Sequence, residues 1–254
     1  MDVRRSSIVL GAALGAAMLW VVGPGAPLAA AAGGGECQLQ GVANLSPPLT
    51  SASGSFSYSF TGTLGTGPMG SCQSNIAGAP TTGSVSAGIQ LSETVPLTRP
   101  GVCTNGRCDD GVTACVNSSQ CPAVVTSGAV LYQEPIPQGS GSCGNSTTAG
   151  ESLVTWADGK HTVVDYDTTG ALAAVVLQGT VGASMTLTLV AGSVPAGFTA
   201  PPTYVINNDE PAFPVGDGSL ALLTFSPTTQ DQNCVTVGVS TANIDGVVGI
   251  GSGT

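Results

Sequence analysis

His161 is the only histidine among the 254 residues. Any hydrolytic site that needs a histidine would therefore have to use it. Hydrolytic triads use a histidine as the base, and zinc sites commonly use several. His161 follows Lys160 in a predicted strand and would lie opposite Trp156, which is typical of cross-strand packing. No G-x-S-x-G nucleophile motif occurs, and Ser142 does not fit that frame. We therefore predict no catalytic residues.

Asp165 and Asp167 are the carboxylates whose spacing best fits acid–base work. Residues two apart in a strand point to the same side, and paired carboxylates flank the substrate in glycoside hydrolysis. Thr168, Thr169 and Gly170 follow directly, and such residues are typical of turns. We interpret the two aspartates as solvated residues near the end of a strand. A glycan-active hydrolase is the less favoured hypothesis.

Oxygen-rich stretches offer the ligand type that Ca²⁺ prefers, since this ion takes six to eight oxygens. The weak metal candidates are Asp109, Asp110, Asp209, Glu210 and Asp217. None of them lies in the spaced pattern of an EF-hand loop. We predict no cofactor, with Ca²⁺ as the one ion that these residues could hold.

Asn105 and Arg107 are the candidate binding residues, within a loop over 99–122. Asn105-Gly106 favours a tight turn that would present Arg107 at an exposed point. An arginine on a rigid loop makes a good contact because little conformational entropy is lost on binding. A passive insertion is the alternative, because surface loops accept extra residues at little thermodynamic cost.

Residues 1–32 have the composition of a secretory signal peptide. Arg4 and Arg5 precede an apolar stretch over 8–22, and small residues end the segment. The apolar stretch is shorter than the ~20 residues that a membrane-spanning helix needs. We therefore predict a secreted protein, extracellular or cell-wall associated, with one domain over 33–254 and no membrane insertion after removal of the leader.

The charge balance limits the partners. The net charge is −10 at pH 7, and only Arg99, Arg107 and Lys160 are cationic beyond the leader. Such an acidic chain has no electrostatic means of holding a phosphate backbone or an anionic lipid surface. We expect no nucleic-acid partner, and instead an unknown protein or cell-envelope partner.

Eight cysteines in a secreted chain indicate disulfides. Their spacing divides them into two groups. One group is dispersed and comprises Cys37, Cys72, Cys143 and Cys234. The other is clustered and comprises Cys103, Cys108, Cys115 and Cys121. We predict the bonds Cys37–Cys72 and Cys143–Cys234, together with two bonds inside the cluster whose connectivity stays open.

Asp158-Gly159 predicts a β-hairpin, because Asp-Gly between strand-forming runs favours a tight turn. A two-residue turn there places Trp156 opposite His161 and Val154 opposite Val163. Both faces of the hairpin then carry apolar side chains, which indicates a strand pair that is covered on both sides. The run 171–181 predicts a further buried strand rather than a short helix.

Alternating apolar residues along the rest of the chain predict about ten strands and no helix, as in 55–61, where Phe56, Tyr58 and Phe60 share one face. Residues 93–123 interrupt this rhythm with prolines, glycines and four cysteines, and we interpret them as an inserted, disulfide-rich loop. The predicted fold is a single-domain antiparallel β-sandwich with this Cys-rich insertion, and a β-barrel is the alternative.

Several segments together resemble a group of uncharacterised secreted β-rich proteins of Gram-positive filamentous bacteria. These segments read CQLQGVANLSP, GSCGNSTTAG, VTWADGKHTVV and NIDGVVGIGSG. The resemblance implies that the four dispersed cysteines belong to the common domain and that the clustered four do not. It brings no assigned activity.

These observations favour a secreted, non-enzymatic β protein that serves as a cell-surface, envelope or extracellular-matrix component. A secreted binding or inhibitory module that acts through the loop 99–122 is the alternative.

Overall fold

The computed structural model describes residues 34–251. These residues form antiparallel strands with one 3-10 turn, η1 (Ser118–Gln120), and contain no α-helix. The predicted all-β fold with its disulfide-rich insertion is therefore confirmed. The predicted leader over 1–32 lies outside the described residues. Within the described part of the chain, no helix has the length and apolar character needed to cross a membrane.

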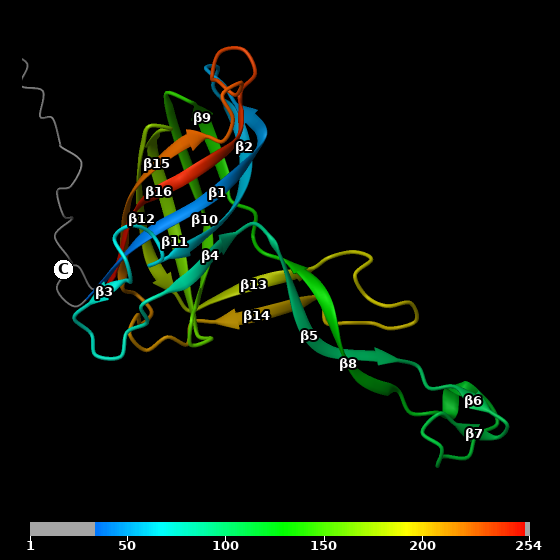
Figure 1. Cartoon of the computed structure of the whole chain (residues 1–254). Helices are drawn as coiled ribbons and strands as arrows, with labels where there is room; N and C mark the ends of the chain where they lie inside the picture. The colour runs from blue at the N-terminus through cyan, green and yellow to red at the C-terminus, as the bar shows by residue number, and fades with distance from the viewer. Residues whose placement is uncertain (1–33, 252–254) are drawn as a thin grey trace, which may run out of the picture.

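The largest sheet closes on itself as an eight-stranded barrel. Figure 1 shows this barrel from the side. Around the barrel, neighbouring strands follow one another in chain order. They are β1 (Gly35–Leu49), β2 (Gly54–Leu64), β4 (Gly83–Ala87), β10 (Asn145–Trp156), β11 (His161–Ala171), β12 (Ala174–Gly182), β15 (Gly218–Pro227) and β16 (Val239–Gly251). Strand β1 pairs with both β2 and β16, which completes the circle. Of the two predicted architectures, the main sheet has the closed one.

The barrel interior is filled mainly by apolar side chains. Alternate residues point inward, so Phe56 and Phe60 of β2, Leu39 of β1 and Leu223 of β15 are all buried. An eight-stranded barrel has an interior just wide enough for side chains to fill. At one end, Phe213 packs against the Trp156 ring, with 5.3 Å between ring centroids. This apolar filling is the main core of the protein.

One strand position in the barrel wall, between β2 and β10, is occupied by two separate strands. Strand β4 pairs with residues 60–64 of β2, and β9 (Gln138–Ser142) pairs with residues 54–57 of the same strand. Both also pair with β10. The chain leaves the wall at Gly88, where a Cβ would lie 2.9 Å from Tyr58 O and from Pro137 Cδ. Residues 88–137 thus leave the barrel wall and return to it at nearly the same place.

The departing segment contributes to a second sheet, in the order β14-β13-β8-β5. Its strands are β5 (Gln90–Arg99), β8 (Val124–Gln133), β13 (Ser184–Leu189) and β14 (Thr203–Asn207). A second core joins Met185 and Leu187 of this sheet to Leu153 and Val163 on the outer face of β10 and β11. Near its turn, the β10–β11 hairpin is therefore covered on both sides, as predicted, whereas Asp165 and Asp167 further along β11 are exposed. This two-sided burial explains why a sandwich was the favoured prediction.

The predicted register of the β10–β11 hairpin is wrong by one residue. Thr155 pairs with His161 and Leu153 with Val163, and the Trp156 N–H donates to Lys160 O at 2.8 Å. The connection thus has three residues rather than two, with Gly159 at φ 86°. A type I turn followed by a residue of positive φ is the common three-residue hairpin loop, and it accepts Asp-Gly as readily as the two-residue turn does.

The predicted insertion over 93–123 begins too early. Residues 93–99 continue β5, in which Val95 and Leu97 are buried. Pro96 lies within this strand, and β5 is at the edge of its sheet. Proline is tolerated at a sheet edge because the missing N–H would otherwise point away from the ladder. The irregular part of the insertion is therefore confined to residues 100–123, which we call the tip.

All eight cysteines form disulfides, and no free cysteine is present in the described chain. The bonds Cys37–Cys72 and Cys143–Cys234 form as predicted. Inside the cluster, Cys103 bonds to Cys115 and Cys108 to Cys121. Two short strands accompany them, β6 (Cys103–Thr104) and β7 (Arg107–Cys108), and β3 (Gln73–Ser74) adds to β1.

Candidate functional site

The hairpin of β5 and β8, which we call the arm, carries the tip away from the barrel (Figure 1). Its two strands pair continuously from Gln90↔Gln133 to Arg99↔Val124. Because both strands belong to the second sheet at their base, the arm is an extension of packed structure. The sequence therefore places the tip at the end of a supported β-ribbon.

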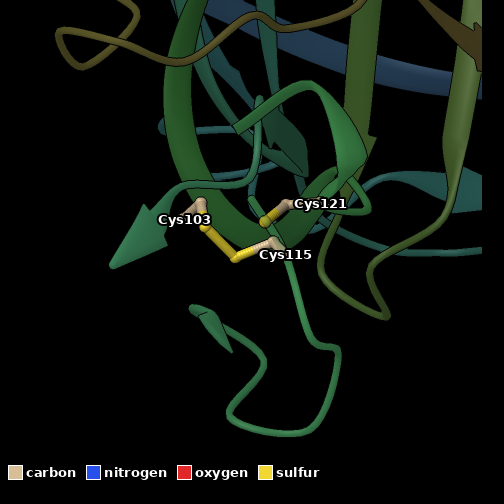
Figure 2. Close-up of side chains that lie close together, drawn as sticks. All are labelled: Cys103, Cys115 and Cys121. Carbon is tan, nitrogen blue, oxygen red and sulfur yellow. A yellow bond between two sulfur atoms is a disulfide. The ribbon is translucent and has the colours of Figure 1, made fainter. Parts of the chain in front are cut away.

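Two interleaved disulfides organise the tip in place of a core. Figure 2 shows the Cys103–Cys115 bond with Cys121 beside it. Each bond closes a loop that contains one cysteine of the other bond, so the two loops share residues 108–115. The apolar side chains here face solvent, with Val112 79% and Val116 89% exposed. Cross-links therefore supply the order that burial supplies elsewhere.

The predicted tight turn at Asn105-Gly106 is present. Both residues have positive φ, 54° and 76°, and the turn joins the paired strands β6 and β7. This is the backbone of a two-residue hairpin turn, for which Asn-Gly is the preferred sequence. Arg107 follows at an exposed position. Its Nη1 donates only weakly, at 3.5 Å, to Gly111 O and Val112 O.

The junction between arm and tip is held by several contacts. Arg99 Nη1 lies 2.5 Å from Asp109 Oδ2, and the Arg99 guanidinium lies 5.9 Å from the centroid of the Phe198 ring. Desolvation raises the pKa of the Asp109 carboxyl, but hydrogen bonds from Arg99 and from the Val102 N–H outweigh it and leave that pKa lowered. Thr98 and Thr199 also exchange two backbone hydrogen bonds. These contacts fix the direction in which the tip projects.

The predicted calcium candidates do not converge on one place in the fold. Asp109 is paired with Arg99, and Asp110 accepts hydrogen bonds from the Val112 and Thr113 N–H groups. Asp209 accepts from the His161 N–H at 2.6 Å, and Glu210 accepts from the Ala212 N–H at 2.9 Å. Asp217 lies in the loop before β15.

Among the described residues, the one group of three metal-ligand side chains close together is Cys103, Cys115 and Cys121. All three sulfurs are bound in disulfides. A thiolate is the form of cysteine that ligates a metal. The group is therefore the centre of the cross-linked tip and not a set of free ligands.

His161 lies on the outside of the barrel. It pairs with Thr155 rather than with the predicted Trp156. Its Nδ1 lies 3.7 Å from Asp209 Oδ1. Trp156 instead points inward and donates from Nε1 to Thr162 Oγ1 at 2.8 Å.

Asp165 and Asp167 do point to the same side, but they do not lie at the end of a strand. Strand β11 continues to Ala171, so both are exposed residues in its middle. Asp165 pairs across the sheet with Glu151, and burial together with the Asp165 charge raises the pKa of the Glu151 carboxyl. The shallow groove over these carboxylates has Tyr166 as its aromatic lining residue, and this ring is buried. It offers no exposed ring for a sugar to stack on.

Sequence reasoning missed two polar features of the interior. Glu134 is only 1% exposed and accepts hydrogen bonds from Ser86 Oγ at 2.6 Å and from the Ile89 N–H at 3.0 Å. Burial raises the pKa of this carboxyl. Glu134 thus links the end of β4 to the start of the arm, at the point where the chain leaves the barrel wall.

The second feature is a cluster of hydroxyl groups inside the barrel. The Tyr58 hydroxyl lies 2.6 Å from that of Tyr166 and 3.0 Å from Thr148 Oγ1, which is in turn 2.7 Å from Thr168 Oγ1. Burial raises the pKa of both tyrosines. The inward position of Tyr58 follows from the alternation of β2, but its partners come from other strands and have no local signature.

Comparison of the chain with protein-family models, with curated proteins and with solved structures found no match.

Proposed function

We propose that this protein is an extracellular, non-enzymatic binding module, in which the barrel is the scaffold and the tip makes the specific contact. The main support is that Val112, Val116 and Arg107 are exposed on the cross-linked tip. The arm holds this tip away from the barrel, and the Arg99–Asp109 pair stabilises the junction between the two. Four disulfides support an extracellular location, because such bonds persist in oxidising compartments.

Rigidity favours a binding role for the tip. Side chains that are already ordered lose less conformational entropy on association, so a larger part of the contact energy appears as affinity. The two disulfides order the tip itself, and the Arg99–Asp109 pair orders its junction with the arm.

The chemistry of the tip indicates the kind of partner. Exposed valines gain from burial against an apolar surface, and arginine is enriched among residues that dominate interface energies. Arg107 has no carboxylate partner among the described residues. We therefore propose an extracellular or cell-wall protein with an apolar patch beside a carboxylate.

The test replaces residues 100–123 with a short Gly-Ser turn between Arg99 and Val124 and measures capture of cell-surface protein from the producing culture. Because β5 and β8 are complete without the tip, we expect the variant to keep its thermal unfolding midpoint and to lose capture. Unchanged capture would refute the contact role.

Point substitutions sharpen this test. Arg107→Ala and Val116→Ala should each weaken capture at least tenfold, as expected for residues at the centre of an interface. Val235→Ala is the matched control, since Val235 is 81% exposed but lies outside the arm and the tip. Equal loss in the control would show that general surface hydrophobicity causes the capture.

A further inference from the structure

The barrel interior contains two small cavities on either side of the hydroxyl cluster. The first has a volume of about 60 Å³ and the second about 50 Å³. Tyr58, Thr168 and Phe225 line both, so the two are separated only by these side chains. Most of the other lining residues are aliphatic, including Leu39, Leu223 and Ile244.

Two serines make the first cavity unusual for an apolar core. Ser152 of β10 is 6% exposed and Ser219 of β15 is 7% exposed, and both line the cavity. Both positions alternate with buried apolar residues, Val154 on β10 and Ala221 on β15, so both side chains point inward. Neither hydroxyl makes a side-chain hydrogen bond to another described residue, and both oxygens border the cavity, since Asn208 Oδ1 is the one fully enclosed side-chain N or O atom without a partner in this part of the chain.

An unpartnered hydroxyl in an apolar interior is costly, because it loses its hydrogen bonds to water on burial. Nearly all buried polar groups in folded proteins have a partner. The other inward hydroxyls obey this rule, since Thr148, Thr168, Tyr58 and Tyr166 bond to one another. Ser152 and Ser219 are therefore arranged to meet a partner from outside the chain.

The size of the cavities limits the ligand. Drug-sized ligands need pockets of about 300 Å³ or more, and an apolar cavity of about 150 Å³ holds benzene. The first cavity has less than half that volume, so a ligand in it has roughly two to four non-hydrogen atoms. No cation lines either cavity, and an unpaired buried charge is strongly unfavourable. The ligand must therefore be neutral.

We propose that the first cavity binds a small neutral amphiphile, such as a short aliphatic alcohol, whose polar group bonds to the Ser152 or Ser219 hydroxyl while its carbon atoms contact the aliphatic wall. This site is independent of the tip.

The test uses 1-propanol as the probe and follows the methyl resonances of Leu223 and Ile244 by NMR. We expect saturable shifts with a Kd of about 1 mM, within the range that ligand efficiency allows for so few atoms. Propionate, the charged analogue, should cause none. Absence of saturable shifts with 1-propanol, or equal shifts with propionate, would overturn the proposal.

The double variant Ser152→Ala/Ser219→Ala separates a binding role from a structural one. It should bind 1-propanol about tenfold more weakly, as expected for loss of one hydrogen bond, while its binding of xenon, an apolar probe, stays the same. Its thermal unfolding midpoint should rise, because two unpartnered hydroxyls are removed. The exposed Ser55→Ala is the matched control and should change nothing.

Two results with the double variant would refute the site. Unchanged affinity for 1-propanol would show that the hydroxyls do not contact the ligand. A lowered unfolding midpoint would show that the serines stabilise the fold through internal water, which needs two to four polar partners.

Discussion

Leu223 and Val116 are both large aliphatic residues, but Leu223 is 4% exposed inside the barrel and Val116 is 89% exposed on the tip. In the barrel, order comes from apolar area removed from water, with disulfides added between distant parts of the chain. In the tip, almost no apolar area is removed, and two interleaved disulfides take the place of a core. The difference implies that the barrel is thermodynamically cooperative and that the tip can change without it.

Tryptophan fluorescence can report on unfolding of the barrel separately from the tip. Trp156 is the only tryptophan in the described part of the chain, and it is buried in the barrel. Its fluorescence therefore follows unfolding of the barrel alone. The following predictions use this signal to measure unfolding of the barrel.

The largest effect is expected from the double variant Cys143→Ala/Cys234→Ala. The bond closes a loop with a sequence separation of 91 residues, for which the chain-entropy model gives about 4 to 5 kcal/mol. The free energy of unfolding from Trp156 fluorescence should fall by an amount of this order. A fall below about 1 kcal/mol would show that the barrel needs no cross-link at that end.

Leu223→Ala should lower the free energy of unfolding by about 2 to 5 kcal/mol, as is usual when a buried leucine is truncated. Val116→Ala is the matched change in the tip and should stay within about 0.5 kcal/mol of wild type. Denaturant titration measures both. Similar values for the two variants would contradict the contrast between barrel and tip.

Cys108→Ala/Cys121→Ala should leave the free energy of unfolding within about 0.5 kcal/mol of wild type, because the tip shares no core with the barrel. The same variant should be cut rapidly by protease between residues 100 and 123, since the tip loses one of the two cross-links that order it. Mass spectrometry of the fragments locates the cut. Loss of Trp156 fluorescence in the variant would show that the tip and barrel unfold together.

Glu134→Gln should change the pH dependence of stability rather than its overall level. Because burial raises the folded-state pKa of Glu134, its stabilising contribution is complete below its unfolded pKa, about 4.3, and is lost as the pH rises through the folded pKa. The stability of wild type relative to Glu134→Gln should therefore fall as the pH is raised above about 4.3 and through the raised folded-state pKa.

Other carboxylates affect both proteins equally and cancel in this difference. A wild type that becomes relatively more stable on raising the pH would mean that the hydrogen bonds from Ser86 and Ile89 outweigh desolvation.

Local patterns were sufficient to predict most of the barrel strands and the two bonds between the dispersed cysteines. The alternation of Phe56, Tyr58 and Phe60 is a direct consequence of the pleat, and Asn105-Gly106 has the residues that a positive φ requires. The Cys143–Cys234 bond followed from the division of the cysteines by spacing. The strand and the turn depend on residues that are near one another in sequence, and the disulfide prediction depends on the number and spacing of the cysteines.

Features set by distant pairing could not be predicted in this way. Closure of the barrel depends on β1 meeting β16, and no local pattern distinguishes that pairing from the edge of an open sheet. The hairpin register was missed because Asp158-Gly159 suits two loop lengths. Glu134 gave no indication of burial, since its partners Ser86 and Ile89 lie on the other side of the inserted arm.

Part of the interior site was within reach of sequence analysis. Ser152 shares its parity with Val154 and Trp156 along β10, so a polar residue at an inward position was visible in the alternation. The meaning of that serine depended on Ser219, which lies on β15 and lines the same cavity. Ser152 and Ser219 line the same cavity only because the sheet closes into a barrel.

Barrel closure also determines how the chain must fold. The seam pairs Gly35 with Ile250 and Asn44 with Thr241, residues from opposite ends of the described chain. Contacts between such distant residues form slowly, because the entropy of closing the intervening loop is lost before the pairing can compensate for it. Until β16 pairs with both of them, β1 and β15 are open edges that can pair with other chains. Refolding yield should therefore fall steeply as protein concentration rises, and a chain that stops before Val239 should remain an aggregation-prone sheet.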